Sequence, residues 1–313
     1  MKFLFILITI FSLTISSYAK YNIVVIKNSN LQQFVEASAG FADTLKQKEG
    51  FDIIEYVLNS DLKEGEKIAK EINAKTPKPD LIYAIGDMSA YVAANKIQDI
   101  PIIFSMILNY KKKGLNLVEK KNVTGISLEV PLEITFIQMQ MIVPGANKIG
   151  LIYSDKSSEI VEGIKQKKSD LGIELIEKKI NSADEIEKAF ANIKNKIQIL
   201  YMVADPVVYT TDSTKFLIET CKKEKIPFIA YSDAFVKAGA LLSISPSYYT
   251  IGSQAATIAE NILVDKTPPE KIGVVSPIGT FFVINALTIE QLKLNVSPDV
   301  FGMADKVYKE ESK

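Results

Sequence analysis

Residues 148–177 read KIGLIYSDKSSEIVEGIKQKKSDLGIELIE, and this stretch decides the fold. The apolar run at 148–153 predicts a buried strand, because short runs rich in branched apolar residues fit a sheet. The pattern at 158–170 predicts an amphipathic helix, and 173–177 predicts a second strand. A strand, a helix and a strand within about 30 residues form the repeating unit of a parallel α/β sheet.

The same alternation extends in both directions from this stretch. The first set of predicted elements has strands at 22–26, 52–57, 80–85, 101–107 and 123–128, with helices at 31–48, 61–74 and 88–96. The second set has strands at 148–153, 173–177, 197–203, 227–231 and 240–245, with helices at 158–170, 183–193, 213–224 and 233–238. A helix at 249–263, short strands at 272–275 and 280–284, and a polar helical tail to Lys313 follow. The sequence therefore predicts an α/β protein with two similar, doubly wound parallel-sheet lobes.

Two of the predicted helices carry recognisable start signals. Ser182 and Glu185 have the spacing of a capping box, in which each side chain bonds the other residue's backbone N–H. Asp61 and Glu64 have the same spacing at the front of the helix predicted at 61–74. Each pattern predicts the first residue of its helix to within one residue.

The composition excludes most familiar catalytic centres. Basic and acidic residues number 37 each, so a net charge of zero offers no basic face to nucleic acid. The chain has no histidine and one cysteine, Cys221, which excludes a Ser-His-Asp triad, a histidine-bound zinc and an internal disulfide. Neither GxGxxG nor a P-loop motif is present. We therefore expect a binding protein that is not an enzyme, with no cofactor or metal; the alternative is an exported enzyme using carboxylates such as Asp205 and Asp233.

The first 19 residues resemble a secretory signal. One lysine precedes an apolar run that is too short to span a bilayer comfortably, and Ser17-Tyr18-Ala19 places small residues where a signal peptidase needs them. The prediction is cleavage after Ala19 and release into the periplasm. Because no cysteine lies near this position, the mature chain is not expected to be a lipoprotein. The alternative is an uncleaved membrane anchor.

Candidate ligand-binding residues follow the predicted strands. Ligands of open parallel sheets bind outside the carboxyl ends of the strands, so the loops that begin there are the candidates. In the first set these loops supply Asn30, Asp87, Ser89 and Asn109, and in the second set Asp155, Asp205, Tyr231, Asp233 and Tyr249. Hydroxyls, amides and carboxylates suit a small polar solute, and the tyrosines suit its flat part. Ordinary helix capping is the alternative reading of Asp87, Asp155 and Asp233.

Several short motifs, in this order and spacing, resemble a known family. They are IPIIF at 100–104, NVTGI at 122–126, VPG at 143–145, IPF at 226–228, AGAL at 238–241 and YYTIG at 248–252. The resemblance is to exported ABC-transporter substrate-binding proteins of the tryptophan/tyrosine-binding type, with a type I periplasmic-binding fold. It covers nearly all of the mature chain.

This resemblance implies two lobes joined by three crossing strands, which close on a solute and dock on an ABC permease in the inner membrane. We expect residues 20–128 and 247–279 in the first lobe, and 129–246 and 280–313 in the second. The expected ligand is an amino acid or a similar zwitterion, and the expected chain is a monomer. Asp87 stands where relatives commonly have a neutral hydroxyl residue, and its charge would repel a ligand carboxylate. A binding protein that serves a sensor or chemoreceptor is the alternative function.

Overall fold

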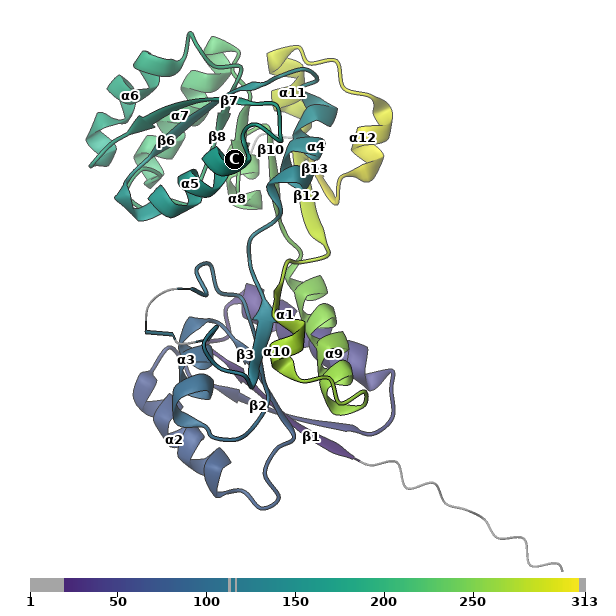
Figure 1. The fold of residues 1–313 in the computed structure, drawn as a ribbon. Helices are drawn as coiled ribbons and strands as arrows, with labels where there is room; N and C mark the ends of the chain where they lie inside the picture. Colours follow the sequence, from purple (N-terminus) through teal and green to yellow (C-terminus); the bar gives the residue numbers. More distant parts are fainter. Residues whose placement is uncertain (1–19, 112–113, 116, 310–313) are drawn as a thin grey trace, which may run out of the picture.

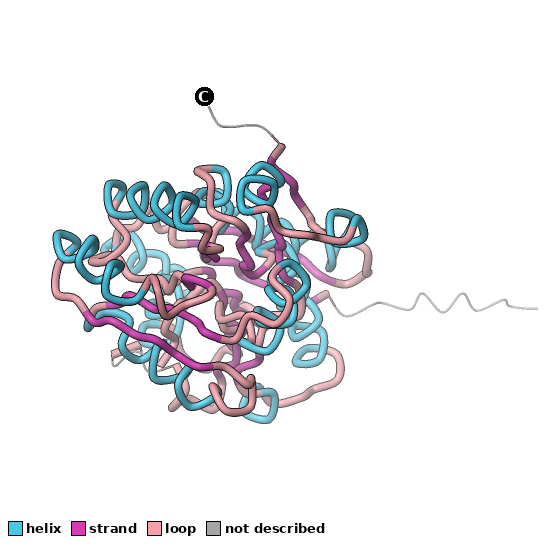
Figure 2. Tube along the Cα trace, turned by 90° about the horizontal axis from the view of Figure 1, so that it is seen from above, coloured by secondary structure: helices cyan, strands magenta, loops and turns pink. Residues whose placement is uncertain are grey.

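The computed structural model describes residues 20–111, 114–115 and 117–309, and it consists of two α/β lobes, one above the other in Figure 1. Each lobe contains one sheet with helices on both faces. In the view from above in Figure 2 the two lobes overlap, with helices around the strands. The predicted class, two doubly wound parallel-sheet lobes joined by several strands, is confirmed. The predicted signal segment lies outside the described residues.

The first lobe is built on a fully parallel sheet in the order β11-β5-β4-β3-β1-β2. Its strands are β1 (Tyr21–Lys27), β2 (Phe51–Val57), β3 (Leu81–Ile85), β4 (Ile102–Ser105), β5 (Val123–Ile126) and β11 (Val274–Val275). Its helices are α1 (Gln32–Lys46), α2 (Leu62–Ala74), α3 (Asp87–Lys96), α9 (Tyr248–Leu263) and α10 (Pro269–Ile272). Because side chains alternate along a strand, Val24 and Ile26 pack beneath α2 and α3, whereas Ile23 and Val25 pack beneath α1 and α9.

The second lobe repeats this plan in the order β13-β12-β10-β9-β8-β6-β7. Its strands are β6 (Lys148–Tyr153), β7 (Glu174–Lys179), β8 (Ile199–Tyr201), β9 (Phe228–Ala230), β10 (Leu242–Pro246), β12 (Thr280–Asn285) and β13 (Lys306–Tyr308). Its helices are α4 (Leu132–Ile142), α5 (Ser158–Lys167), α6 (Ile186–Ile193), α7 (Thr211–Glu224), α8 (Asp233–Lys237), α11 (Ala286–Leu292) and α12 (Pro298–Met303), with short 3₁₀ turns at Asp155–Ser157 and Ala183–Glu185. Strand β12 is antiparallel to β10 and parallel to β13.

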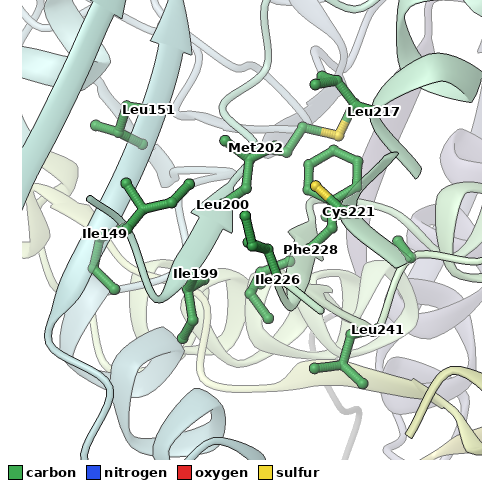
Figure 3. Close-up of a cluster of buried hydrophobic side chains, with 14 of the residues drawn as sticks. Ile149, Leu151, Ile199, Leu200, Met202, Leu217, Cys221, Ile226, Phe228 and Leu241 are labelled. Carbon is green, nitrogen blue, oxygen red and sulfur yellow. The ribbon is translucent and has the colours of Figure 1, made fainter. Parts of the chain in front are cut away.

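The core of the second lobe is a continuous apolar cluster. In Figure 3, Leu217 and Cys221 of α7 project toward Leu200 of β8 and Phe228 of β9. The Cys221 thiol is free and buried, and this burial raises its pKa. The cysteine therefore serves as a small core residue rather than as a nucleophile.

The chain passes between the two sheets three times. It leaves β5 for α4, returns from β10 to α9, and leaves again from β11 to β12. The crossing segments are bonded to one another, since Ser247 N–H donates to the Gly279 carbonyl at 3.1 Å. The Gln254 side chain of α9 bonds the backbone of Ser276 and Ile278 in the third segment. These bonds join the second and third connections, and Ser127 N–H at the start of the first connection donates to the Val275 carbonyl of β11 at 2.9 Å.

Three parts of the secondary-structure prediction were wrong. Helix α4 was missed because it is apolar on nearly every side: Phe136 and Met139 are buried, yet Ile137 is 64% exposed, so the sequence shows no amphipathic stripe. The tail predicted as helical ends in strand β13, which forms by pairing with β12 rather than from any local signal. The Ser182 side chain makes no capping bond, and Glu185 accepts from Asn181 N–H instead.

Candidate functional site

The carboxyl ends of both sheets face the gap between the lobes. Strand β5 leaves the first sheet for the second lobe from its carboxyl end, and β1, β3 and β4 run parallel to it. Strand β10 leaves the second sheet for the first lobe in the same way, parallel to β6, β8 and β9. The loops that follow all these strands therefore meet between the lobes (Figure 1), and we call this part of the molecule the interlobe region.

In the first lobe, the side chain of Asn28 joins the loops that follow β1 and β3. Its Oδ1 accepts from both the backbone N–H and the hydroxyl of Ser89, each at 2.8 Å, and its Nδ2 donates to Asp87 Oδ1 at 2.7 Å. Asn28 thus caps helix α3 from 61 residues away, by satisfying the N–H of its first turn. We did not predict this role for Asn28, although it lies in a loop that the strand-end rule selects.

Gly86 makes this close contact feasible. Its φ of +104° lies in a region that favours glycine, and an added Cβ would lie 2.5 Å from Cγ of Asn28. Ser89 is completely buried, and its hydroxyl is shared among Asn28 and the carbonyls of Ile85 and Gly86. Ser89 therefore has a structural role at this junction, and its ligand contact stays a prediction. Asp87 is exposed, and its Oδ1 also accepts from Met88 N–H.

In the second lobe, the carboxylate of Asp205 joins the loops that follow β6 and β8. It is 2% exposed and accepts from five donors: the backbone and hydroxyl of Ser154, the hydroxyl of Ser157, and the N–H groups of Val207 and Val208. Burial alone would raise the pKa of this carboxyl, but the bonds from Ser157, Ser154 and Val208 outweigh it and lower the pKa. With five donors on its two oxygens, Asp205 organises the loop around it.

The two other predicted aspartates of this lobe are paired with lysines. Asp155 forms an exposed ion pair with Lys179 of β7. Asp233 accepts from Lys306 of β13 at 2.9 Å, and the same ammonium lies 4.6 Å from the centre of the Tyr308 ring. The charge on each aspartate is therefore already compensated within the protein.

The capping interpretation of Asp87, Asp155 and Asp233 places each of them one residue too early. Asp87, Asp155 and Asp233 are each the first residue of their helical segment. The N-cap positions before them are occupied by Gly86, Ser154 and Ser232. The negative charge of each aspartate interacts favourably with the positive N-terminal end of its helix, but none of the three occupies the N-cap position.

One predicted residue of the first lobe contacts the second lobe directly. Asn109 Nδ2 donates to Glu159 Oε2 of α5 at 3.0 Å. Both side chains are exposed, and the apolar side chains next to them, Leu108 and Ile160, are exposed as well. Asn30, the remaining candidate of the first lobe, is also exposed in the loop after β1.

Two tyrosines, one from each lobe, lie at the interlobe region. Tyr231 follows β9, is 39% exposed, and packs edge-on against Phe235 with 5.2 Å between ring centres. Tyr248 begins α9 and is half-buried, and its pKa is raised by burial and then by the charges of Glu36 and Tyr231. The hydroxyl of the neighbouring Tyr249 instead donates to Asp43 of α1 at 3.4 Å. Tyr248, which we did not predict, is thus a further candidate beside Tyr249, whose ligand contact stays a prediction.

This arrangement can bind a small polar solute with a flat part. Among the described residues, no group of three or more His, Cys, Asp or Glu side chains lies close enough to hold a metal ion. Over the same residues, no helix combines the length and the apolarity needed to cross a membrane. The chemistry on offer is that of carboxylates, amides, hydroxyls and aromatic rings.

Comparison with known proteins agrees with this description. A family model described as ABC transporter substrate binding protein matches residues 22–308. A tyrosine-binding protein from Clostridioides difficile is 30% identical over 285 residues, which are 86% of this chain and 81% of that protein.

Solved structures share the fold. A ligand-free, open substrate-binding protein with adhesive properties from Clostridium difficile has a TM-score of 0.79 at 23% identity, covering 93% of this chain and 100% of that chain. An ABC domain in complex with L-Trp from Streptococcus pneumoniae has a TM-score of 0.60 at 20% identity, covering 92% and 100%. With a family model that spans both lobes and a fold of the type I periplasmic-binding kind, this chain belongs to the ABC transporter substrate-binding protein family.

Proposed function

We propose that this protein captures an amino acid with an aromatic side chain outside the cytoplasm and delivers it to an ABC permease, without catalysis. In this proposal the signal segment 1–19 is removed after Ala19, and the mature monomer is free in the periplasm. The lobes comprise residues 20–128 with 247–279, and 129–246 with 280–313. Ligand binding favours a closed arrangement of these lobes because both sets of strand-end loops then contact the same solute.

The observation that carries the proposal is the pair Tyr231 and Tyr248, one from each lobe. A ring that enters between them would contact the aromatic faces of both, and only a closed arrangement provides both contacts. Two similar proteins, the tyrosine-binding protein and the domain in complex with L-Trp, point to the same class of solute. Neutral donors such as the exposed Asn30 side chain remain as partners for a carboxylate.

The test is titration calorimetry with L-tyrosine, L-tryptophan, L-phenylalanine, L-leucine and D-ribose. We expect saturable binding of at least one aromatic amino acid and none of the sugar. Replacing Tyr248→Ala should weaken that binding at least tenfold, whereas Tyr249→Ala, the neighbouring tyrosine bonded to Asp43, should change it less than twofold. Tight binding of the sugar with no response to the amino acids would refute the proposal.

Closure and export have their own measurements. Small-angle scattering should show a smaller radius of gyration at saturation with the aromatic amino acid, since the lobes approach each other. Mass analysis of the mature protein should begin at Lys20. A chain that retains Met1 in the membrane fraction would contradict the export part of the proposal.

A further inference from the structure

The carboxylates around the interlobe region differ in what already compensates them. Lysines neutralise Asp155 and Asp233, and five donors saturate Asp205. Asp87 and Glu159 accept from the neutral amides of Asn28 and Asn109, but both are exposed to solvent, which screens their charge. Asp233 is half-buried and its Oδ1 has no hydrogen-bond partner, but Lys306 pairs with its Oδ2 and compensates the charge. None of the five therefore combines an uncompensated charge with a sheltered position.

Glu36 on α1 has both properties. It is half-buried, and its Oε1 accepts from the neutral Gln32 side chain at 2.9 Å. Among the described residues, no lysine forms an ion pair with it. After burial, the charge of Glu36 contributes to the raised pKa of Tyr248.

The packing of α1 against α9 fixes Glu36 and Tyr248 near each other. The two helices approach so closely that a Cβ on Gly252 would lie 1.9 Å from the Ala37 carbonyl oxygen. Glu36 is the residue before Ala37, and Tyr248 lies one turn before Gly252 on α9. The start of α9 is anchored at the hinge, because Ser247 caps the helix and its N–H donates to Gly279.

The second lobe supplies the third member. Strands β9 and β10 pair Ile229 with Leu242 and Ala230 with Ser243. Continuing this register places Tyr231 level with Ile244, close to the point where the chain crosses toward Tyr248. The edge-on contact with Phe235 restricts the Tyr231 ring while leaving 39% of the residue exposed.

The geometry points to an ammonium subsite formed by Glu36, Tyr231 and Tyr248, which anchors the amine end of the ligand; this rests on the proposed function. A sheltered carboxylate gives an ammonium a charge-assisted hydrogen bond, and aromatic faces attract the same cation. The sequence contains no arginine, so no bidentate guanidinium is available for the ligand carboxylate. The amine is therefore the charged end of the solute that this protein recognises most strongly.

Three solutes with the same ring test this subsite: L-tyrosine, tyramine, which lacks the carboxylate, and 3-(4-hydroxyphenyl)propionate, which lacks the amine. The unmodified protein should bind the first two at least tenfold more tightly than the third. Replacing Glu36→Gln should weaken L-tyrosine and tyramine at least tenfold, about 1.4 kcal/mol. The same substitution should leave the propionate unchanged, because that probe brings no ammonium to the site.

Two matched substitutions serve as controls. Glu159→Gln and Asp87→Asn also remove a carboxylate that has a neutral partner, and each should change tyramine affinity less than threefold. Equal affinities of Glu36→Gln and the unmodified protein for tyramine would overturn the subsite while leaving the proposed function intact. Absence of binding of all three probes and of the other aromatic amino acids to the unmodified protein would overturn both. Thermal unfolding of each variant checks that a loss of binding does not reflect a loss of folding.

Discussion

In each lobe one side chain joins the loops that follow the first and third strands, and we call this side chain the tie. The tie is neutral in one lobe and charged in the other. In the first lobe the tie is Asn28, a neutral amide that accepts from Ser89 and donates to Asp87. In the second lobe the tie is Asp205, a buried carboxylate that only accepts. Asn28 follows β1, the first strand of its lobe, whereas Asp205 follows β8, the third strand of its lobe. One fold plan thus has two solutions for the same junction.

The difference lies in what each solution demands of its surroundings. An amide donates and accepts, so Asn28 can join a hydroxyl and a carboxylate without any net charge in the junction. A buried carboxylate is stable only when donors satisfy its lone pairs, since an uncompensated charge in the interior is costly. A ligand contact was predicted at Ser89, which the first tie holds, and at Asp205, which is the second tie. In the structure both ties make the strand-end loops rigid.

The largest effect is expected from Asp205→Asn. In either orientation, the amide nitrogen would face backbone donors, either Ser154 N–H or those of Val207 and Val208. We expect the free energy of unfolding to fall by about 3 kcal/mol, because buried donors lose a charged acceptor. Urea unfolding measures this change. Asp170→Asn, an exposed position, is the control, and an equally small effect of both substitutions would show that the five bonds contribute little.

A smaller effect is expected from giving the first lobe a charged tie. Asn28→Asp places a second carboxylate beside Asp87, where the present separation from Nδ2 is 2.7 Å, and it removes the donor that Asp87 uses. We expect a loss of about 2 kcal/mol in unfolding free energy. Adding Asp87→Asn should recover most of that loss, because the new amide can donate to the new carboxylate. A double variant no more stable than the single one would mean that the amide's shape, rather than its charge, matters at this junction.

The sequence predicted the sheets well because the signal for them is local. Residues 148–153, predicted as a strand from their apolar run, are β6 to the residue. The strand-end rule also selected the loops in which Asn28, Asp205 and Tyr231 lie. Apolar periodicity and the topology of parallel sheets are sufficient for that level of detail.

The individual side chains could not be predicted, because their partners are distant in the sequence. Ser89 and Asn28 are 61 residues apart, and Lys306 and Asp233 are 73 apart. The choice of Tyr249 over Tyr248 depended on which face of α9 meets α1, and that face is set by the contact between Gly252 and Ala37. A local pattern gives no information about such contacts, so buried junction residues and exposed site residues look alike in the sequence.

The smallest effect is expected from pH, because the stability contributed by the charged tie Asp205 depends on pH and that contributed by the neutral tie Asn28 does not. The pKa of Asp205 is lowered in the folded protein, so the unfolded chain binds more protons as the solution is acidified. The stability that its charge contributes is complete above the unfolded value of about 3.9, and it is lost as pH falls through the folded value. The neutral tie at Asn28 has no such dependence.

Urea unfolding between pH 6 and pH 3 measures this dependence. The difference in unfolding free energy between the unmodified protein and Asp205→Asn should shrink below about pH 4. Glu66 and Glu133, whose pKa values are lowered by hydrogen bonds from Lys96 and Lys167, are present in both proteins and cancel in that difference. A difference that stays constant down to pH 3 would mean that Asp205 contributes through shape and hydrogen-bond geometry, as Asn28 does, and that the charge itself adds nothing to the junction.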